Sequence, residues 1–148
     1  MHYAARGSPR ILSLLLKAGV NVNVANSDGY TPLHWAARGG LRRTECVDLL
    51  LKAGAAVNAK ANGWETPFDI ALTQGHRRAY PLLLRAGAES RTYETDPYIV
   101  RVRNAGGFKK YARNHLAAVT KLFKDNGRGL PPEVVRHIVK FWLHAGYY

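Results

Sequence analysis

The sequence is poor in cysteine, in acidic residues and in long apolar runs. Cys46 is the only cysteine among 148 residues, so no disulfide can form within the chain, and this usage fits a reducing compartment. Because Cys46 lies in an apolar helical pattern with Val47 and Leu50, we expect a small core residue and not a nucleophile. No apolar run approaches the roughly 20 residues that span a bilayer. We therefore expect an intracellular protein, cytoplasmic or nuclear, without membrane association.

The scarcity of acidic residues bears on catalysis. There are 10 Asp and Glu against 22 Lys and Arg, for a net charge of +12. The acidic residues are scattered, and no phosphate-binding glycine loop or nucleophile–base constellation accompanies them. His137 and His144 are seven residues apart, whereas paired metal ligands on a helix are normally three or four apart. The sequence thus predicts no enzyme, cofactor or metal site, and its positive charge favours anionic partners.

What the chain does contain is an internal repeat. A leucine triplet followed by a basic residue, alanine and glycine occurs three times, at steps of 35 and 33 residues. A Thr-Pro segment occurs twice in between. The copies are Leu14–Gly19, Leu49–Gly54 and Leu82–Gly87 for the first signature, and Thr31–Ala36 and Thr66–Ala71 for the second.

Each signature has a physical interpretation. Pro32 and Pro67 suit the first turn of a helix, which the preceding threonine can cap. The leucine triplet belongs to a second helix, which ends at a glycine such as Gly54. One such unit cannot bury its apolar face alone, so the units are predicted to stack.

This pattern resembles the ankyrin repeat over roughly residues 1–90. The resemblance implies an all-α solenoid of helix-turn-helix units joined by β-hairpin turns, which binds proteins without catalysis. We delimit three repeats, 1–27, 28–61 and 62–90, followed by a helical C-terminal cap over 91–148 that includes a degenerate repeat-like helix pair. A monomer is expected. The expected partner is an unidentified protein, and an acidic one would suit the positive charge of this chain.

Two departures from the family pattern lead to specific expectations. His2-Tyr3-Ala4-Ala5 aligns with the interior of the Thr-Pro helix, so the first copy is truncated, and we favour a fragment of a longer array over an imperfect cap. Trp64 stands where the family's turn usually has glycine. The second hairpin is therefore expected to bend at Asn62-Gly63 instead.

The C-terminal third predicts helices over Tyr98–Asn104 and from Phe108 to about Lys124, separated by Gly106-Gly107. Tyr111, Leu116, Val119 and Phe123 are expected on one face. A last helix opens at Pro131, with four apolar residues expected to face inward: Val135, Ile138, Val139 and Trp142. The simplest interpretation is that these C-terminal helices cap the stack of repeats.

The alternative for the C-terminal helices is a ubiquitin-ligase adaptor. Leu130-Pro131-Pro132-Glu133 resembles the opening of an F-box, although too few residues follow for the rest of that motif. A suppressor-of-cytokine-signalling box is the other comparison. Leu116 would be its contact leucine, but Thr120 stands where cysteine is usual.

The resemblance assigns partner binding to the hairpin tips and the exposed face of each first helix. Large aromatics and arginine dominate interface energetics, so Tyr30, Trp64 and Arg38 are the best anchors. Packing of Trp64 over the neighbouring hairpin is the alternative, and Trp35 is assigned to packing. The full set is Ser27, Asp28, Tyr30, Arg38, Asn62, Trp64, Glu65, Thr73 and Gln74.

A second candidate surface is basic. Arginines recur at corresponding places, in the loop before each second helix, and stacking would align them as a ridge. Such a ridge suits an acidic protein, phosphate or nucleic acid, although a solvated edge is the simpler interpretation. This arginine ridge consists of Arg10, Arg42, Arg43, Arg77 and Arg78.

Overall fold

The computed structural model describes residues 1–40, 42–89, 96–125, 131, 133–134 and 137–138, with the backbone alone for 122–125. The chain divides into two compact units, Met1–Thr92 and Tyr93–Tyr148, and each is considered by itself.

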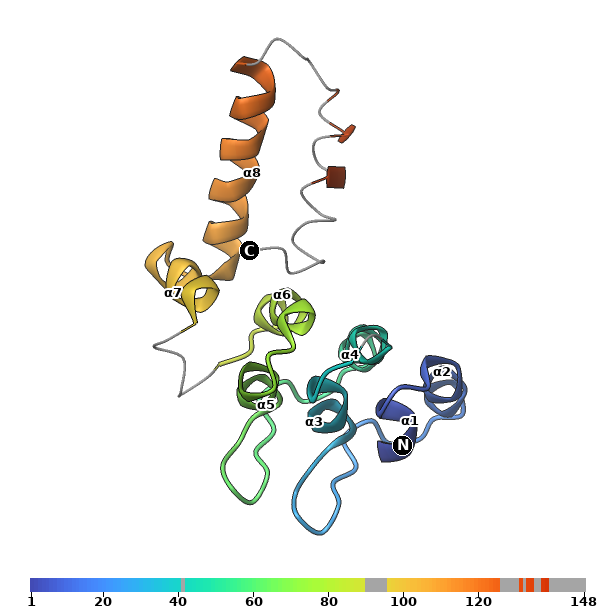
Figure 1. Cartoon of the computed structure of the whole chain (residues 1–148). Helices are drawn as coiled ribbons and strands as arrows, with labels where there is room; N and C mark the ends of the chain where they lie inside the picture. The colour runs from blue at the N-terminus through green and yellow to red at the C-terminus, as the bar shows by residue number, and fades with distance from the viewer. Residues whose placement is uncertain (41, 90–95, 126–130, 132, 135–136, 139–148) are drawn as a thin grey trace. The chain divides into compact units, whose positions relative to one another are not determined.

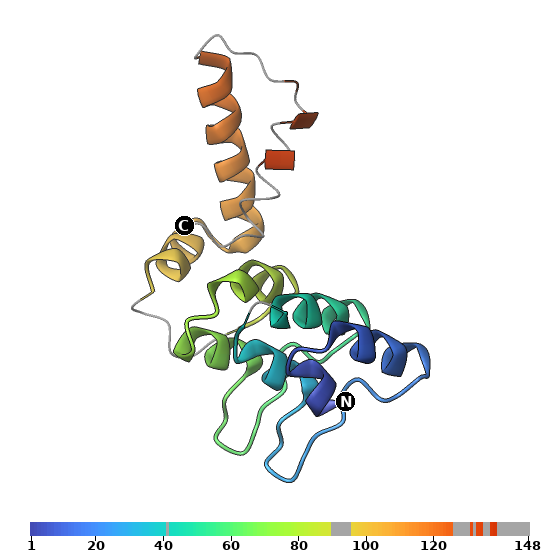
Figure 2. The ribbon, with the colours of Figure 1, turned by 45° about the vertical axis from the view of Figure 1, so that its right-hand side comes forward.

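The first unit is a row of three helix pairs, as Figures 1 and 2 show. The first helices of the pairs lie in one layer and the second helices in another, with two hairpin loops extending from the first layer. No strand is assigned among the described residues, and the predicted all-α fold is confirmed. The pairs are α1 (His2–Ala5) with α2 (Pro9–Lys17), α3 (Pro32–Ala37) with α4 (Arg43–Lys52), and α5 (Pro67–Thr73) with α6 (Tyr80–Arg85), the last preceded by the 3₁₀ helix η1 (Arg77–Ala79).

The Thr-Pro helices begin as the sequence predicts. In α5, the Thr66 hydroxyl accepts the Asp69 N–H at 3.2 Å, and the Asp69 carboxylate accepts the Thr66 N–H at 3.0 Å. In α3, His34 takes the place of the aspartate, and its Nδ1 accepts the Thr31 N–H at 3.0 Å. These reciprocal bonds satisfy backbone donors that a helix start leaves unpaired.

The second helices end at glycines in the left-handed conformation. Gly19, Gly54 and Gly87 have φ values of 75°, 84° and 93°. After Gly54, the Ala55 N–H returns to the Leu50 carbonyl at 3.0 Å, which closes the helix end.

The core of this unit lies between the two helix layers. Leucines such as Leu12, Leu33 and Leu83 are fully buried, and small alanines of the first helices allow the layers to approach. Cys46 is fully buried as well, and burial raises the pKa of its thiol. The expectation of a core cysteine is confirmed.

The second hairpin corrects one expectation. Trp64 itself adopts the left-handed conformation, with φ 62°, as Gly29 does in the first hairpin with φ 78°. The Ala61 N–H donates to the Glu65 carbonyl at 3.1 Å, as the Asn26 N–H donates to the Tyr30 carbonyl at 3.1 Å. The chain does bend at Asn62-Gly63 as predicted, since the Trp64 N–H donates to the Ala61 carbonyl at 2.8 Å. This bend does not replace the left-handed turn position, however, because Trp64 occupies that position itself.

The second unit contains α7 (Pro97–Asn104) and α8 (Phe108–Asp125), which match the predicted helices. The Asp96 carboxylate caps α7 by accepting the Tyr98 N–H at 2.9 Å. Tyr98 packs edge-to-face on Tyr111, with ring centroids 5.6 Å apart. Of the face predicted for α8, Tyr111 and Val119 are buried and Leu116 is half-buried. The side chain of Phe123 lies outside the described set.

Little of the last predicted helix is described. Residues 133–134 and 137–138 are helical, and Ile138 is half-buried. Leu130, Val135, Val139 and Trp142 lie outside the described residues, so both the cap and the ligase-adaptor alternative stay predictions. None of the helices that the structure describes is long and apolar enough to cross a membrane.

Candidate partner-binding surface

The two hairpins lie side by side and are joined by hydrogen bonds. The Asn62 N–H donates to the Asp28 carbonyl at 2.9 Å, and the Asn62 side-chain amide donates to the Ser27 carbonyl at 3.4 Å. Nearer the helices, the Tyr30 hydroxyl donates to the Glu65 carboxylate at 3.0 Å. The structure thus brings five of the predicted binding residues together on one surface.

Tyr30 is held in place from both sides. Its ring meets His34 at a centroid distance of 5.4 Å and Trp35 at 6.0 Å. The hydrogen bond to Glu65, together with burial and the negative charge of Glu65, raises the pKa of the Tyr30 phenol above its ordinary value. The phenol therefore stays neutral at physiological pH.

His34 connects one repeat to the next. Its Nδ1 accepts a bond from Thr31, which leaves the proton on Nε2, and this N–H points to the Glu65 carbonyl at 3.2 Å. Burial is the main cause that lowers the pKa of His34, while bonds to carbonyls act in the opposite direction. The neutral imidazole, with its proton on Nε2, is thus the form that makes both hydrogen bonds.

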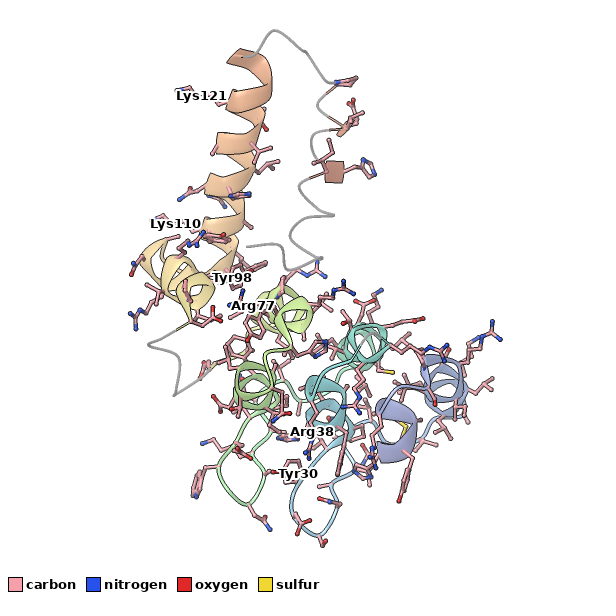
Figure 3. The ribbon with its side chains drawn as sticks, viewed as in Figure 1. Tyr30, Arg38, Arg77, Tyr98, Lys110 and Lys121 are labelled. Atoms are coloured by element: carbon pink, nitrogen blue, oxygen red, sulfur yellow. The ribbon has the colours of Figure 1, made fainter. Side chains whose placement is uncertain are left out.

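An aromatic and arginine cluster surrounds Trp35 next to α1 and α3. The guanidinium carbons of Arg6 and Arg38 each lie 5.3 Å from the Trp35 ring centroid, and Arg6 also lies 5.7 Å from that of Tyr3. These distances fit cation–π contacts. Figure 3 shows Arg38 at α3 and Tyr30 at the base of the adjoining hairpin.

A pocket of about 230 Å³ lies beside this cluster. Its lining residues are His2, Tyr3, Arg6, Asn26 and Trp35. The Trp35 indole N–H is buried, and among the described residues it has no hydrogen-bond partner. The pocket has the size of one large side chain.

Sequence reasoning missed this pocket, because Trp35 was assigned to packing and residues 1–6 were given no binding role. The alignment of His2-Tyr3 with His34-Trp35 was the available signal.

Trp64 projects from the second hairpin. Its side chain is 65% exposed, so it does not pack over the neighbouring hairpin. The Lys60 ammonium lies 4.9 Å from its ring centroid. The bulky residue nevertheless occupies the left-handed region, which favours glycine.

The remaining predicted residues lie at the ends of first helices. Arg38 is the C-cap of α3, and Gln74 is the C-cap of α5. Thr73 is also exposed, although its hydroxyl donates to the Asp69 carbonyl of its own helix at 2.9 Å. Arg38 and Thr73 occupy equivalent positions of successive repeats. Both therefore lie along the same edge of the surface.

The arginine ridge differs from its prediction in local structure. Arg10 and Arg43 lie within the first turns of α2 and α4, Arg42 is the N-cap of α4, and Arg77 and Arg78 form η1. The second helices therefore start earlier than expected, because Pro9 serves as a first helical residue in α2 and a 3₁₀ turn precedes α6.

One member of the ridge is structural. The Arg43 Nε–H donates to the Arg6 carbonyl at 2.9 Å and so joins two repeats. Nearby, buried His76 takes a bond from the Thr44 hydroxyl at 2.9 Å and reaches the Ala37 carbonyl at 3.2 Å. Burial is the main cause that lowers the pKa of His76. Arg10, Arg42 and Arg78 are exposed.

Among the residues that the structure describes, no group of three or more His, Cys, Asp or Glu side chains is placed to hold a metal ion.

The stacked helix pairs and paired hairpins define a helical-repeat solenoid whose hairpins and first helices share one surface. The family model described as ankyrin repeats matches residues 1–93 in three copies, and the chain belongs to this family. Protein phosphatase 1 regulatory subunit 12A of mouse (Mus musculus) and that of rat (Rattus norvegicus) are each 51% identical to it over 37 residues. That alignment covers 25% of this chain and 4% of each relative's length.

Proposed function

We propose that this protein is a non-catalytic interaction module that binds a partner protein on the surface formed by the hairpins and first helices. The observation that carries the proposal is Trp64. A tryptophan in the left-handed conformation costs on the order of 1–2 kcal/mol relative to the same residue in an ordinary conformation. Burial of the side chain does not offset this cost, because Trp64 is 65% exposed.

The cluster around Trp35 gives the surface a second anchor. Large rigid rings and arginine lose little conformational entropy on binding and bury much area, so they carry most of the energy of protein interfaces. Arg6 and Arg38 favour a partner with carboxylates next to an apolar side chain that fits the pocket. The relatives' name is that of a regulatory subunit of a phosphatase, which supports a binding role over catalysis.

A quantitative affinity capture tests the proposal. The intact protein and the variant W64G plus R38A are immobilised side by side, and captured proteins are compared by mass spectrometry. Loss of two anchors worth about 2 kcal/mol each is expected to weaken binding of the specific partner by roughly 700-fold. R85A, at the end of α6 in the second-helix layer, is the matched control and should retain capture. Equal capture by all three proteins would contradict the proposal.

A second candidate function is anion binding through the arginine ridge. The exposure of Arg10, Arg42 and Arg78 near the starts of successive second helices favours it. Binding of a single-stranded oligonucleotide should weaken steeply with salt, and R10A, R42A and R78A should each reduce the salt slope by about 1. Arg43→Ala is not suitable, since this side chain also joins two repeats. An unchanged slope in the triple variant would exclude the ridge.

A further inference from the structure

Helices α7 and α8 of the second unit carry positive charge that no acidic residue interrupts. Residues 97–124 contain seven Lys and Arg and no Asp or Glu. Asp96 and Asp125 stand at the two ends of this stretch, and Asp96 is the N-cap of α7. In the first unit, by contrast, Glu45 and Asp48 share α4 with its basic residues, so charges of both signs are mixed there. The positive charge of the second unit is thus concentrated on α7 and α8.

These cations are exposed and do not pair with carboxylates of the fold. Each Lys and Arg of α7 and α8 whose side chain the structure describes is exposed, and none forms an ion pair with another described residue. Repulsion among like charges costs free energy, so the arrangement does not serve the stability of the unit. The six described cations are Arg101, Arg103, Lys109, Lys110, Arg113 and Lys121.

Three of the cations lie on one side of α8. Lys110, Arg113 and Lys121 follow at intervals of three and eight residues, which brings them close to one another around the helix axis. Figure 3 shows Lys110 and Lys121 on the same side of α8, and about three turns, or about 16 Å, separate them along the axis. Asn114 and Ala117 are exposed between them. We call Lys110, Arg113 and Lys121 the basic face of α8.

The junction between α7 and α8 adds charge at one end of the basic face. The Lys110 side chain lies over the linker, since a Cβ at Gly106 would meet its Cδ at 3.3 Å and its Nζ at 3.7 Å. Burial raises the pKa of the Tyr111 phenol, and the positive charge of Arg101 opposes that rise. Arg101 of α7 is therefore near α8, at the same end as Lys110.

The opposite side of α8 is covered. Tyr111 packs on Tyr98 and is 8% exposed, and Val119 is likewise 8% exposed. A basic amphipathic helix binds a membrane surface or a groove of another protein through its apolar side. In α8 that side is in contact with the rest of its own unit, so the charged side is the one that is available to a partner.

The exposed side of α7 and α8 lacks the anchors that proteins and single strands require. Protein interfaces depend on aromatic and apolar anchors and are depleted in lysine, and single-stranded nucleic acid stacks its bases on aromatic rings. None of the exposed large apolar side chains in the described part of the chain belongs to α7 or α8. They are Tyr3, Ile11, Leu14, Val20, Val24, Trp64 and Val134.

We propose that the basic face of α8, together with Arg101, binds the phosphate backbone of double-stranded DNA without reading its sequence. Lys, Arg and Asn side chains beside small residues are the groups that contact duplex phosphates. The major groove of B-form DNA is about 12 Å wide, so cations about 16 Å apart on one helix reach phosphates on both of its sides. The deep, narrow major groove of duplex RNA does not admit side chains in this way. The surface belongs to the second unit and is separate from the arginine ridge.

Fluorescence anisotropy of a labelled DNA duplex with the full chain tests the proposal. If about four cations contact phosphates, binding should weaken by about 150-fold between about 50 and 200 mM salt. Lys110→Gln, Arg113→Gln and Lys121→Gln should each lower the slope of log affinity against log salt by about 0.9, and each should weaken binding by about eightfold at about 0.1 M salt. Arg113→Lys should stay within about twofold of the unmodified chain, because phosphate contacts depend on charge. A duplex of scrambled sequence should bind equally well.

The matched controls remove the same charge from the first unit. Arg10→Gln, Arg42→Gln and Arg78→Gln alter exposed arginines outside α7 and α8, and each should change the affinity by less than about twofold at about 0.1 M salt, where screening is strong beyond about 10 Å. Glutamine has nearly the helix propensity of lysine and arginine, so Tm of every variant should stay within about 2 °C.

Three outcomes would overturn the proposal. The first is absence of binding at low salt. The second is an equal loss of affinity in the first-unit controls, which would mean that net charge alone attracts the duplex. The third is tighter binding of duplex RNA or of polyglutamate than of duplex DNA, which would assign the basic face to a different polyanion.

Discussion

The second and third repeats solve the same two structural problems with different residues. At the start of the first helix, one repeat uses His34 as the capping partner and the other uses Asp69. At the hairpin turn, one repeat places Gly29 in the left-handed conformation and the other places Trp64 there. The fold therefore dictates the hydrogen-bond pattern and the backbone angle, while the residue at each position sets pH sensitivity, strain and exposure.

Removing the capping partner should produce the largest effect. His34→Ala leaves the Thr31 N–H and the Glu65 carbonyl without their bonds in a buried site, so we expect the free energy of unfolding to fall by about 2–4 kcal/mol. Asp69→Ala should cost about 1–3 kcal/mol, because it breaks the bonds of the capping box to Thr66. Urea unfolding monitored by circular dichroism measures both. A larger loss for Asp69→Ala would mean that the bond from His34 to Glu65 contributes little.

Substitution of Gly29 should have the next largest effect. A Cβ at this position would lie 3.1 Å from the Cα atom of Ala61 and would sit on a residue with φ 78°. We expect Gly29→Ala to lower the unfolding free energy by about 1–2 kcal/mol. Gly63→Ala, in the other hairpin but outside the left-handed region, is the control and should change it by less than about 0.5 kcal/mol. Equal losses would remove the distinction between the two turn positions.

The reverse substitution should stabilise the protein. Trp64→Gly relieves about 1–2 kcal/mol of conformational strain and loses about 0.5–1 kcal/mol to the greater freedom of glycine in the unfolded chain. The expected net gain is about 0.5 kcal/mol in unfolding free energy. A loss of stability would show that the contact with Lys60 outweighs the strain, and Lys60→Ala measured alone would separate the two contributions.

A pH dependence should be the smallest effect. Because burial lowers the pKa of His34 in the folded state below its ordinary 6.5, the unfolded chain binds more protons between these two values. Stability is thus full above pH 6.5 and declines as the pH falls below it, by at most about 1.4 kcal/mol per pH unit for each such histidine.

The pKa of His76 is also lowered, mainly by burial. Protonation of His76 therefore adds to the loss of stability as the pH falls. Chemical denaturation between pH 7.5 and 5.5 measures the combined effect of the two histidines on the unfolding free energy. Titration of the two imidazoles by NMR separates their contributions. The Asp69 cap of the third repeat provides the contrast, since it contains no histidine. A stability that rises toward pH 5.5 would contradict the neutral form assigned to His34.

The repeat could be predicted from the sequence because its signals are local. Thr31-Pro32 and Thr66-Pro67 start helices, and Gly54 and Gly87 end them, through bonds within a few residues. The two helices of the second unit followed from the same kinds of signal. The predicted hairpin surface also followed, because a fixed repeat length places Asp28 beside Asn62 and Tyr30 beside Glu65.

The pocket beside Trp35 could not be predicted in the same way. It depends on side chains of α1, the first hairpin and α3, which only stacking brings together. The left-handed conformation of Trp64 is a similar case. The propensity of tryptophan argues against it, but the bonds from Ala61 to Glu65 and from Asn62 to Asp28 hold this hairpin in register with its neighbour.

The amino-acid sequence by itself determined the helix pairs, their order and the family, because caps, glycines and apolar periodicity act over short distances. Only the tertiary structure decided which apolar side chains are covered, since Ile11, Cys46 and Ala79 occupy equivalent positions and differ in whether a repeat lies against them. It also decided that Trp64 is exposed and strained, and that Arg6 and Arg38 both meet Trp35. These properties depend on what stacking places next to each residue.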